Sequence, residues 1–204
     1  MCCTLVGMVT VRLAHGDDLA RLPDIERAAG EVFRSLGMDA VADDEPPTLE
    51  ELGGYQRAGR VIVGEDDGRI VGYLLLDLIA DAAHIEQVSV HPDVARRRLG
   101  SQLIDAAERW AREQGVSSLT LTCYQHVSWN GPYYARLGFH VVPEAEQPLE
   151  LRVVRRAETA RGLDAWPRVV MRRPITSARP DIWPADRTPG VGAGRGASIT
   201  DPPR

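Results

Sequence analysis

The chain has 204 residues and a net charge of −5; 44% of its residues are hydrophobic and 26% are charged. This length and composition fit one compact domain with short tails, and the negative charge argues against a general nucleic-acid binder, which needs a cationic surface. No apolar run approaches the ~20 residues of a membrane-spanning helix, and no segment has the form of a secretory signal. We therefore expect a cytoplasmic protein with no nucleic-acid or membrane partner.

The amino-terminal half is predicted to form a strand, two helices and a three-stranded meander. Residues 9–13 alternate like a strand, and apolar residues from 19 to 33 recur at helical spacing after a cap at Asp17 or Asp18. An acidic loop over 39–47 follows, and Thr48 with Glu51 forms a capping box that opens a second helix. Residues 60–65, 70–79 and 84–90 then alternate as antiparallel strands separated by turns.

The carboxyl-terminal half begins with a clear amphipathic helix that ends at Gly115, and its apolar positions are Leu99, Leu103, Ile104, Ala107, Trp110 and Ala111. A strand over 117–124 follows, then a helix from Asn130 to Gly138. Strands over 139–142 and 168–172 close the domain, with a variable stretch between them. We expect an α/β sheet with helices on both faces in a domain over 9–175, and a disordered tail rich in Pro, Gly and Arg over 176–204.

The cysteines and basic residues carry little chemistry. Cys2 and Cys3 lie too near the terminus to form a disulfide framework, and Cys123 in its apolar strand is expected to be a small buried hydrophobe. No Cys/His spacing suits a metal, so no metal site is predicted. Every basic residue is arginine, which is typical of a bacterium with a GC-rich genome.

An arginine-rich loop leads directly into the amphipathic helix. Arg96, Arg97 and Arg98 precede the first turn at Leu99, Gly100 and Ser101. The free N–H groups of a helix start, reinforced by the helix dipole and by guanidinium groups, suit a pyrophosphate or a 3′-phosphate. The alternative is a solvated helix start with no ligand.

Three segments in this order, 83–92, 95–101 and 129–139, resemble the GNAT acetyltransferase superfamily, with arylalkylamine and small-amine acetyltransferases as the nearest type. The resemblance implies a mixed, mostly antiparallel sheet that splays at the cofactor cleft. It also implies acetyl-CoA as donor and direct attack by a primary amine in a ternary complex. Ala95 and Arg98 depart from the family pattern, which has Gln or Arg and then glycine there. We expect Arg98 to fit with helical backbone angles, and Arg96 and Arg97 to compensate through side-chain contacts.

The resemblance also assigns the cofactor contacts. Backbone of the strand over 84–90 would pair with the pantetheine arm, and the Val88 amide would stabilise the oxyanion. Asn130 is expected to cap the following helix and to touch the same arm. The residues implied to bind the cofactor are Val88, Ser89, Val90, Arg96, Arg97, Arg98, Leu99, Gly100, Ser101 and Asn130.

Three residues are candidates for the chemistry. Strand alternation places His84 and Glu86 on one side together with Val88 and Val90. Glu86, alone or through water with His84, is the candidate base that deprotonates an amine of pKa ~10; the alternative is a structural ion pair. By resemblance, Tyr134 protonates the departing thiolate, and the alternative is a buried aromatic residue.

The acceptor is expected over the first helices and the loop that follows them. That loop is acidic, and a cationic amine would be drawn to it; its carboxylates and those of the preceding helix are Asp39, Asp43, Asp44, Glu45, Glu26 and Glu31. Aromatic residues that could line the pocket are Trp129, Tyr133, Tyr55 and Phe33. A small-molecule amine is favoured, and a homodimer is possible. Two alternative functions stay open. One is a protein or peptide N-acetyltransferase, although Thr122 and Val127 replace the Glu and Asn of one such branch. The other is a non-catalytic acyl-CoA sensor.

Overall fold

The computed structural model describes residues 9–175, so the predicted tail lies outside the described residues. The strands are β1 (Thr10–Leu13), β2 (Val61–Asp66), β3 (Arg69–Ile79), β4 (Ala82–Val90), β5 (Ser118–Tyr124), β6 (His140–Val141) and β7 (Arg168–Pro174). The helices are α1 (Leu22–Gly30), α2 (Asp39–Ala42), α3 (Leu49–Arg57), α4 (Leu99–Glu113), α5 (Gly131–Arg136) and α6 (Leu149–Ala160). Short 3-10 helices are η1 (Gly16–Arg21), η2 (Glu31–Leu36), η3 (Pro92–Val94), η4 (Glu144–Glu146) and η5 (Leu163–Ala165). Within 9–175, no helix is both long and apolar enough to cross a membrane.

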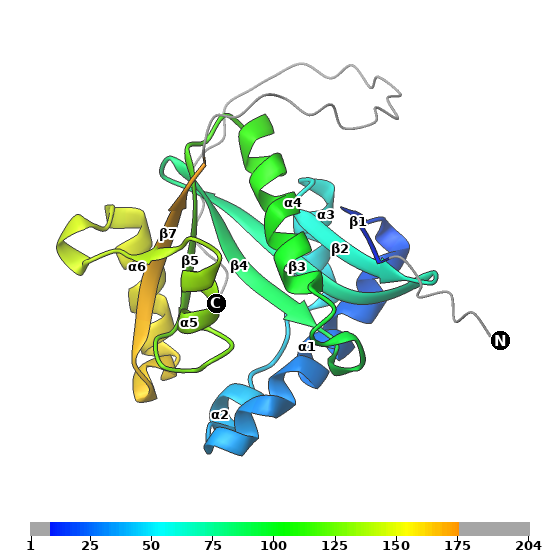
Figure 1. Ribbon diagram of the computed structural model, residues 1–204, viewed down its shortest axis with the longest axis horizontal. Helices are drawn as coiled ribbons and strands as arrows, with labels where there is room; N and C mark the ends of the chain where they lie inside the picture. Colours follow the sequence, from blue (N-terminus) through cyan, green and yellow to red (C-terminus); the bar gives the residue numbers. More distant parts are fainter. Residues whose placement is uncertain (1–8, 176–204) are drawn as a thin grey trace.

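The described strands form one sheet in the order β1-β2-β3-β4-β5-β7-β6. Only the β4–β5 pair is parallel, and the other neighbours are antiparallel. Helices α4 and α5 lie on one face, and α1, α3 and α6 lie on the other (Figure 1). The predicted α/β fold, with a mixed and mostly antiparallel sheet covered on both faces, is confirmed.

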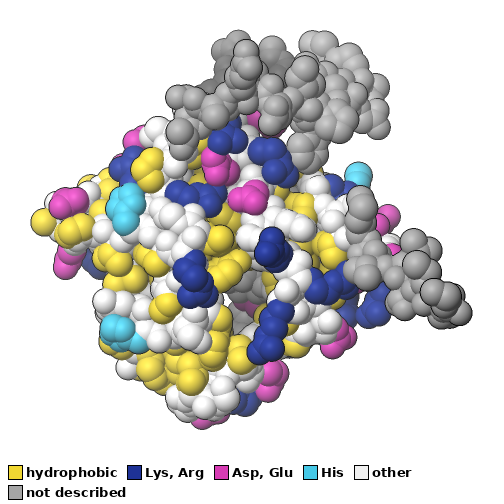
Figure 2. Space-filling view, viewed as in Figure 1, with side chains coloured by type: hydrophobic (Ala, Val, Ile, Leu, Met, Phe, Trp, Pro, Cys, Tyr) yellow, Lys and Arg dark blue, Asp and Glu magenta, His cyan; other side chains and the backbone are white. Residues whose placement is uncertain are grey.

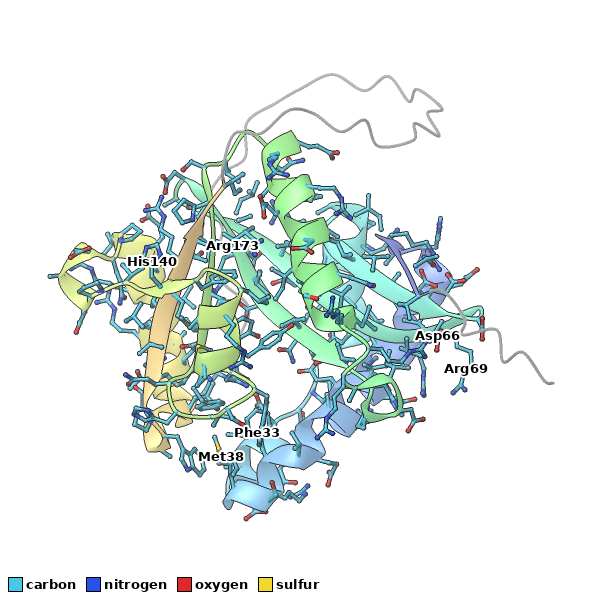
Figure 3. The ribbon with its side chains drawn as sticks, viewed as in Figure 1. Phe33, Met38, Asp66, Arg69, His140 and Arg173 are labelled. Carbon is cyan, nitrogen blue, oxygen red and sulfur yellow. The ribbon has the colours of Figure 1, made fainter. Side chains whose placement is uncertain are left out.

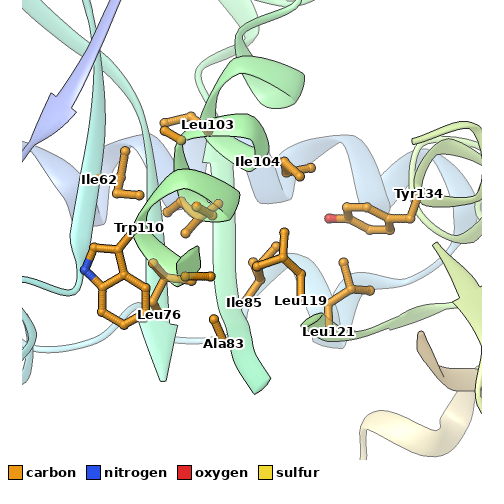
Figure 4. Packing of buried hydrophobic residues seen from close by; sticks show 14 of the residues in the cluster. Ile62, Leu76, Ala83, Ile85, Leu103, Ile104, Trp110, Leu119, Leu121 and Tyr134 are labelled. Carbon is orange, nitrogen blue, oxygen red and sulfur yellow. The ribbon is translucent and has the colours of Figure 1, made fainter. Parts of the chain in front are cut away.

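Alternation along the central strands separates two apolar cores. On β3, Leu74 and Leu76 pack with α4, whereas Tyr73 and Leu75 pack with α1 and α3. All six predicted apolar positions of α4 are buried; a fully buried leucine such as Leu103 contributes roughly 2 kcal/mol. Figure 4 shows this core from close by, with Tyr134 approaching it from α5. The stripe on α4 therefore fixes the helix over the sheet and sets where its amino terminus lies.

The structure departs from the predicted elements at two places. The helix expected over 19–33 is divided into η1, α1 and η2. Pro23 accounts for the break between η1 and α1, because it lacks an N–H group and its ring interferes with the preceding turn. The stretch expected to be variable contains α6, which lies between Pro148 and the left-handed Gly162 (φ 79°). These are ordinary start and stop signals, so this helix was missed although the sequence signals it.

Candidate active site

A gap opens in the middle of the sheet because β4 and β5 pair over only part of their length. Pairing runs from Ala82 with Ser118 to Ile85 with Leu121. Beyond these residues β4 continues to Val90 and β5 to Tyr124 without pairing with each other. Figure 2 shows a hollow near the centre of this face of the molecule, with basic side chains around it. The predicted splay at the cleft is confirmed.

The backbone of β4 presents free polar groups to this gap. The His91 amide donates to the Val71 carbonyl at 2.8 Å, which makes that pair a hydrogen-bonded one. In an antiparallel ladder the hydrogen-bonded pairs alternate, so the N–H and C=O groups of Val88 and Val90 point away from β3. They face the splayed side, where an extended ligand can take the place of a strand.

Glu86 occupies a β-bulge on β4. Gln87 is opposite Leu75 and Ile85 is opposite Leu76, so Glu86 has no partner residue on β3. The extra residue resets the alternation of the strand. Val88 packs with Ile85 in the core beside α4. The prediction that Glu86 and His84 share one side with Val88 and Val90 is therefore wrong.

His84 is a buried neighbour of Glu86. Its side chain is 1% exposed, its Nδ1 lies 3.0 Å from Thr120 Oγ1, and its Nε2 lies 3.9 Å from a carboxylate oxygen of Glu86. Burial lowers the pKa of His84 to about 4. The imidazole is thus neutral at physiological pH, and it can accept or donate a hydrogen bond without carrying charge.

The surroundings of Glu86 favour the protonated, neutral form of its carboxyl group. Its pKa is raised to about 7, chiefly by burial and further by the charges of Asp77 and Glu158, while Arg161 and Arg168 oppose the rise. The side chain nevertheless keeps 41% of its surface exposed, so the carboxyl group remains accessible to a ligand. A carboxylate poised near neutral pH suits a general base.

Tyr134 approaches the gap from the opposite face of the sheet. It is 8% exposed and packs edge-to-face against Tyr133 and Phe139. Figure 4 shows its hydroxyl directed towards Ile104 and Leu119, over the β4–β5 junction. Burial raises the pKa of this phenol well above its ordinary value, so the hydroxyl keeps its proton and remains a donor.

The start of α4 has the expected free amides but an unexpected backbone. Arg98, the N-cap residue, has left-handed angles (φ 63°, ψ 13°), so the prediction of helical angles at Arg98 is wrong. No side chain caps this end, and the first-turn amides at Leu99, Gly100 and Ser101 have no intrahelical acceptor. A β-carbon at Gly100 would lie 3.0 Å from the hydroxyl oxygen of Tyr133. Glycine therefore lets α5 approach this helix start closely.

The arginines before α4 have different partners. Arg97 donates to both carboxylate oxygens of Asp66 at 2.5 and 3.1 Å, in the β2–β3 turn labelled in Figure 3. Arg96 and Arg98 are exposed. Arg97 is therefore committed to the turn, while Arg96 and Arg98 stay accessible to an anion at the helix start.

The comparisons with known proteins agree with this geometry. The model of the acetyltransferase (GNAT) family matches residues 23–139, more than half of the chain. The chain belongs to the GNAT acetyltransferase family. Membership confirms the predicted family, and with it acetyl-CoA as the acyl donor.

Solved structures share the fold of this GNAT protein at low sequence identity. N-acetylglutamate synthase from Neisseria gonorrhoeae, complexed with coenzyme A and N-acetyl-glutamate, has a TM-score of 0.62 and 21% identity; the match covers 83% of this chain but only 35% of that one. PaiA N-acetyltransferase from Thermoplasma acidophilum, in complex with coenzyme A, has a TM-score of 0.58 and 15% identity; the match covers 82% of this chain and 99% of that one. The ribosomal-protein-S18-alanine N-acetyltransferase from Escherichia coli has a TM-score of 0.58 and 17% identity; the match covers 86% of this chain and 99% of that one.

Not every predicted cofactor residue of the GNAT site reaches the gap. Ser89 is opposite Tyr73 on β3 and is buried on the α1 face, so neither its backbone nor its side chain faces the splay. Asn130 stands at the N-cap of α5, but its side chain makes no capping hydrogen bond; its carbonyl accepts from the Tyr134 amide at 2.9 Å. The predicted side-chain cap is therefore wrong. Cys123 is buried, as predicted.

Several site residues were not found from the sequence. Glu158 of α6 accepts hydrogen bonds from Thr122 on β5 and, at 2.9 Å, from Arg168 on β7. Asp77 on β3 lies opposite His84 and is held by Tyr55 and Arg60. Only the three-dimensional pairing brings these residues beside Glu86. The helical periodicity of α6 would have predicted the helix but not this contact.

Proposed function

We propose that this GNAT protein transfers the acetyl group of acetyl-CoA to a small primary amine by direct attack in a ternary complex. The proposal rests on one arrangement: an open strand edge at Val88 and Val90, with the Glu86 carboxyl on one side of the sheet and the Tyr134 phenol on the other. Donor and acceptor can then meet within the gap. The α4 amides, with Arg96 and Arg98, would hold the diphosphate of the donor.

Each group has a defined part in the transfer. When bound, the donor would supply an electrophilic thioester carbonyl, and the Val88 amide would donate a hydrogen bond to its oxygen. Glu86 takes one proton from the ammonium group, which frees a lone pair to form the N–C bond. Tyr134 donates its proton to sulfur as the C–S bond breaks, and the second proton of the nitrogen passes to water as the amide forms. Solvent then returns a proton to Tyr134 and takes the proton from Glu86, so one proton is released in each turnover. His84 stays neutral beside Glu86 and can order a water between them.

Steady-state release of coenzyme A with a panel of amines tests this function. We expect turnover with small primary amines, and we expect Tyr134→Phe to lower kcat by ~10²-fold or more because the variant lacks the acid. Tyr133→Phe is the comparison variant: its hydroxyl lies beside Gly100 at the start of α4, so its removal should change the KM for acetyl-CoA and keep most of kcat. Turnover only with peptides would favour a protein acetyltransferase. Tight acetyl-CoA binding without turnover of any amine or peptide would favour a sensor.

A further inference from the structure

An apolar cluster drawn from three separate segments lies at the end of β5 that does not pair with β4. Met38, Tyr124 and Val127 are its buried members, and Phe33, Val41, Trp129 and Trp166 pack against them. They come from the η2–α2 segment, from β5 with the loop after it, and from the connection between α6 and β7. We call these seven residues the floor cluster. It joins the α1–α2 arm to β5 across the splayed strands.

The floor cluster is closely packed at its centre. Phe33 contacts Tyr124 and Trp129 edge-to-face, with centroid distances of 5.7 and 5.8 Å, and Met38 is 1% exposed. Phe33 and Met38 lie together at the lower edge of the molecule in Figure 3, between α2 and the end of β5. Such edge-to-face pairs add stability beyond area burial. The floor cluster therefore ties the η2–α2 segment firmly to the end of β5.

One ion pair spans the same end of the site. Arg161, directly after α6, donates to both carboxylate oxygens of Asp44 at 3.0 and 2.7 Å, although 117 residues separate them. Arg161 opposes the rise in the pKa of both Glu26 on α1 and Glu86 on β4. Asp44 follows Val41 and Arg161 precedes Trp166, two members of the floor cluster, so the pair lies at the same end of the site. Its side chains are 54% and 45% exposed, so it can open without unfolding anything.

Most carboxylates of the acidic loop have arginine partners. Arg34 of η2 pairs with Glu31, Asp39 and Asp43, so one guanidinium group offsets only one of these three negative charges. Asp44 alone reaches across to another layer of the structure through Arg161. The predicted acidic rim thus keeps a net negative charge, and Asp44 also ties it to the end of α6.

We propose that the Asp44–Arg161 pair is a latch between α6 and the α1–α2 arm that restricts the acceptor to small amines. The floor cluster packs the η2–α2 segment against the end of β5, and the latch ties the loop after α2 to the end of α6. A small amine can reach Glu86 while the latch is formed. A peptide amino terminus needs it open. This specificity role rests on the proposed transferase function.

Substitutions at both ends of the latch test its role. Asp44→Asn and Arg161→Gln should each raise the ratio of kcat/KM for a tripeptide amino terminus to kcat/KM for a small arylalkylamine by about two- to fivefold, the range for an exposed ion pair. The double charge reversal, Asp44→Arg with Arg161→Asp, should bring the ratio back towards the wild-type value. Asp81→Asn is the matched control, because it breaks the exposed, long-range Arg172–Asp81 pair at the other end of β4.

The outcomes distinguish failure of the latch from failure of the proposed transferase function. Unchanged selectivity in both single variants, or a charge-reversed double variant no better than the singles, would overturn the latch while leaving the transferase intact. An equal change in selectivity in Asp81→Asn would also overturn the latch, because loss of any surface ion pair would then have the same effect. Absence of turnover by the wild-type chain with every amine would instead sink the proposed function.

Discussion

Glu86→Gln replaces the candidate base by a neutral group of the same shape. With a pKa of about 7, about one tenth of the Glu86 side chains are ionised near pH 6 and about nine tenths near pH 8, whereas an ordinary glutamate is ionised throughout this range. We therefore expect wild-type kcat/KM to rise roughly tenfold between these pH values and then level off. Near neutral pH the variant should lose ~10²- to 10⁴-fold in kcat/KM.

The shape of the variant's pH profile is the more specific test. Without Glu86, only amine that has already lost its proton in solution can react. The kcat/KM of the variant should then rise about tenfold per pH unit towards the amine pKa of ~10, and should approach the wild type at high pH. Profiles would be recorded from coenzyme A release with one amine at saturating donor. Glu150→Gln, an exposed carboxyl at the start of α6, is the matched control and should keep the wild-type profile.

Stability separates a catalytic loss from a folding defect. The folded state raises the pKa of Glu86 from 4.5 and so binds its proton more tightly than the unfolded chain does. This carboxyl therefore favours folding at low pH, and that contribution is lost as the pH rises from about 4.5 to about 7. Glu86→Gln should unfold at the same or a higher temperature than the wild type at about pH 8. Two results would refute the reasoning: a pH profile of Glu86→Gln that runs parallel to that of the wild type, or a loss of thermal stability together with activity.

Backbone geometry gives the remaining predictions. Arg98→Gly should stabilise the fold by roughly 0.5–1 kcal/mol, because glycine adopts the left-handed angles at φ 63° without strain; thermal unfolding measures this, and a lower midpoint would contradict it. Because Arg98 is exposed beside the α4 amides, the same change should raise the KM for acetyl-CoA by several-fold, and an unchanged KM would remove it from the phosphate site. Gly131→Ala should destabilise by about 1–3 kcal/mol, because its β-carbon would lie 2.5 Å from the Gln125 carbonyl oxygen. Gly54→Ala is its control: nothing lies within 4 Å of that position on α3, so the helix should gain about 0.5–1 kcal/mol.

Local signals were enough to predict most elements and the family. The capping box of Thr48 and Glu51 opens α3 as expected, with Thr48 Oγ1 accepting from the Glu51 amide at 3.2 Å. The apolar stripe of α4 depends only on residue spacing, and burial followed it at every predicted position. Periodicity and caps act over a few residues, so a single sequence reports them directly.

The sequence by itself determined the fold class, the family and the candidate acid and base at Tyr134 and Glu86. The bulge that turns Glu86 out of the strand alternation was set by tertiary structure, because it depends on how β4 pairs with β3. The approach of Glu158 and Arg161 to the site was decided in the same way, since Thr122 lies 36 residues from Glu158 and Asp44 lies 117 residues from Arg161 along the chain. Side-chain electrostatics depend on distance in space rather than in sequence, so the pKa of Glu86 became visible only in the folded chain.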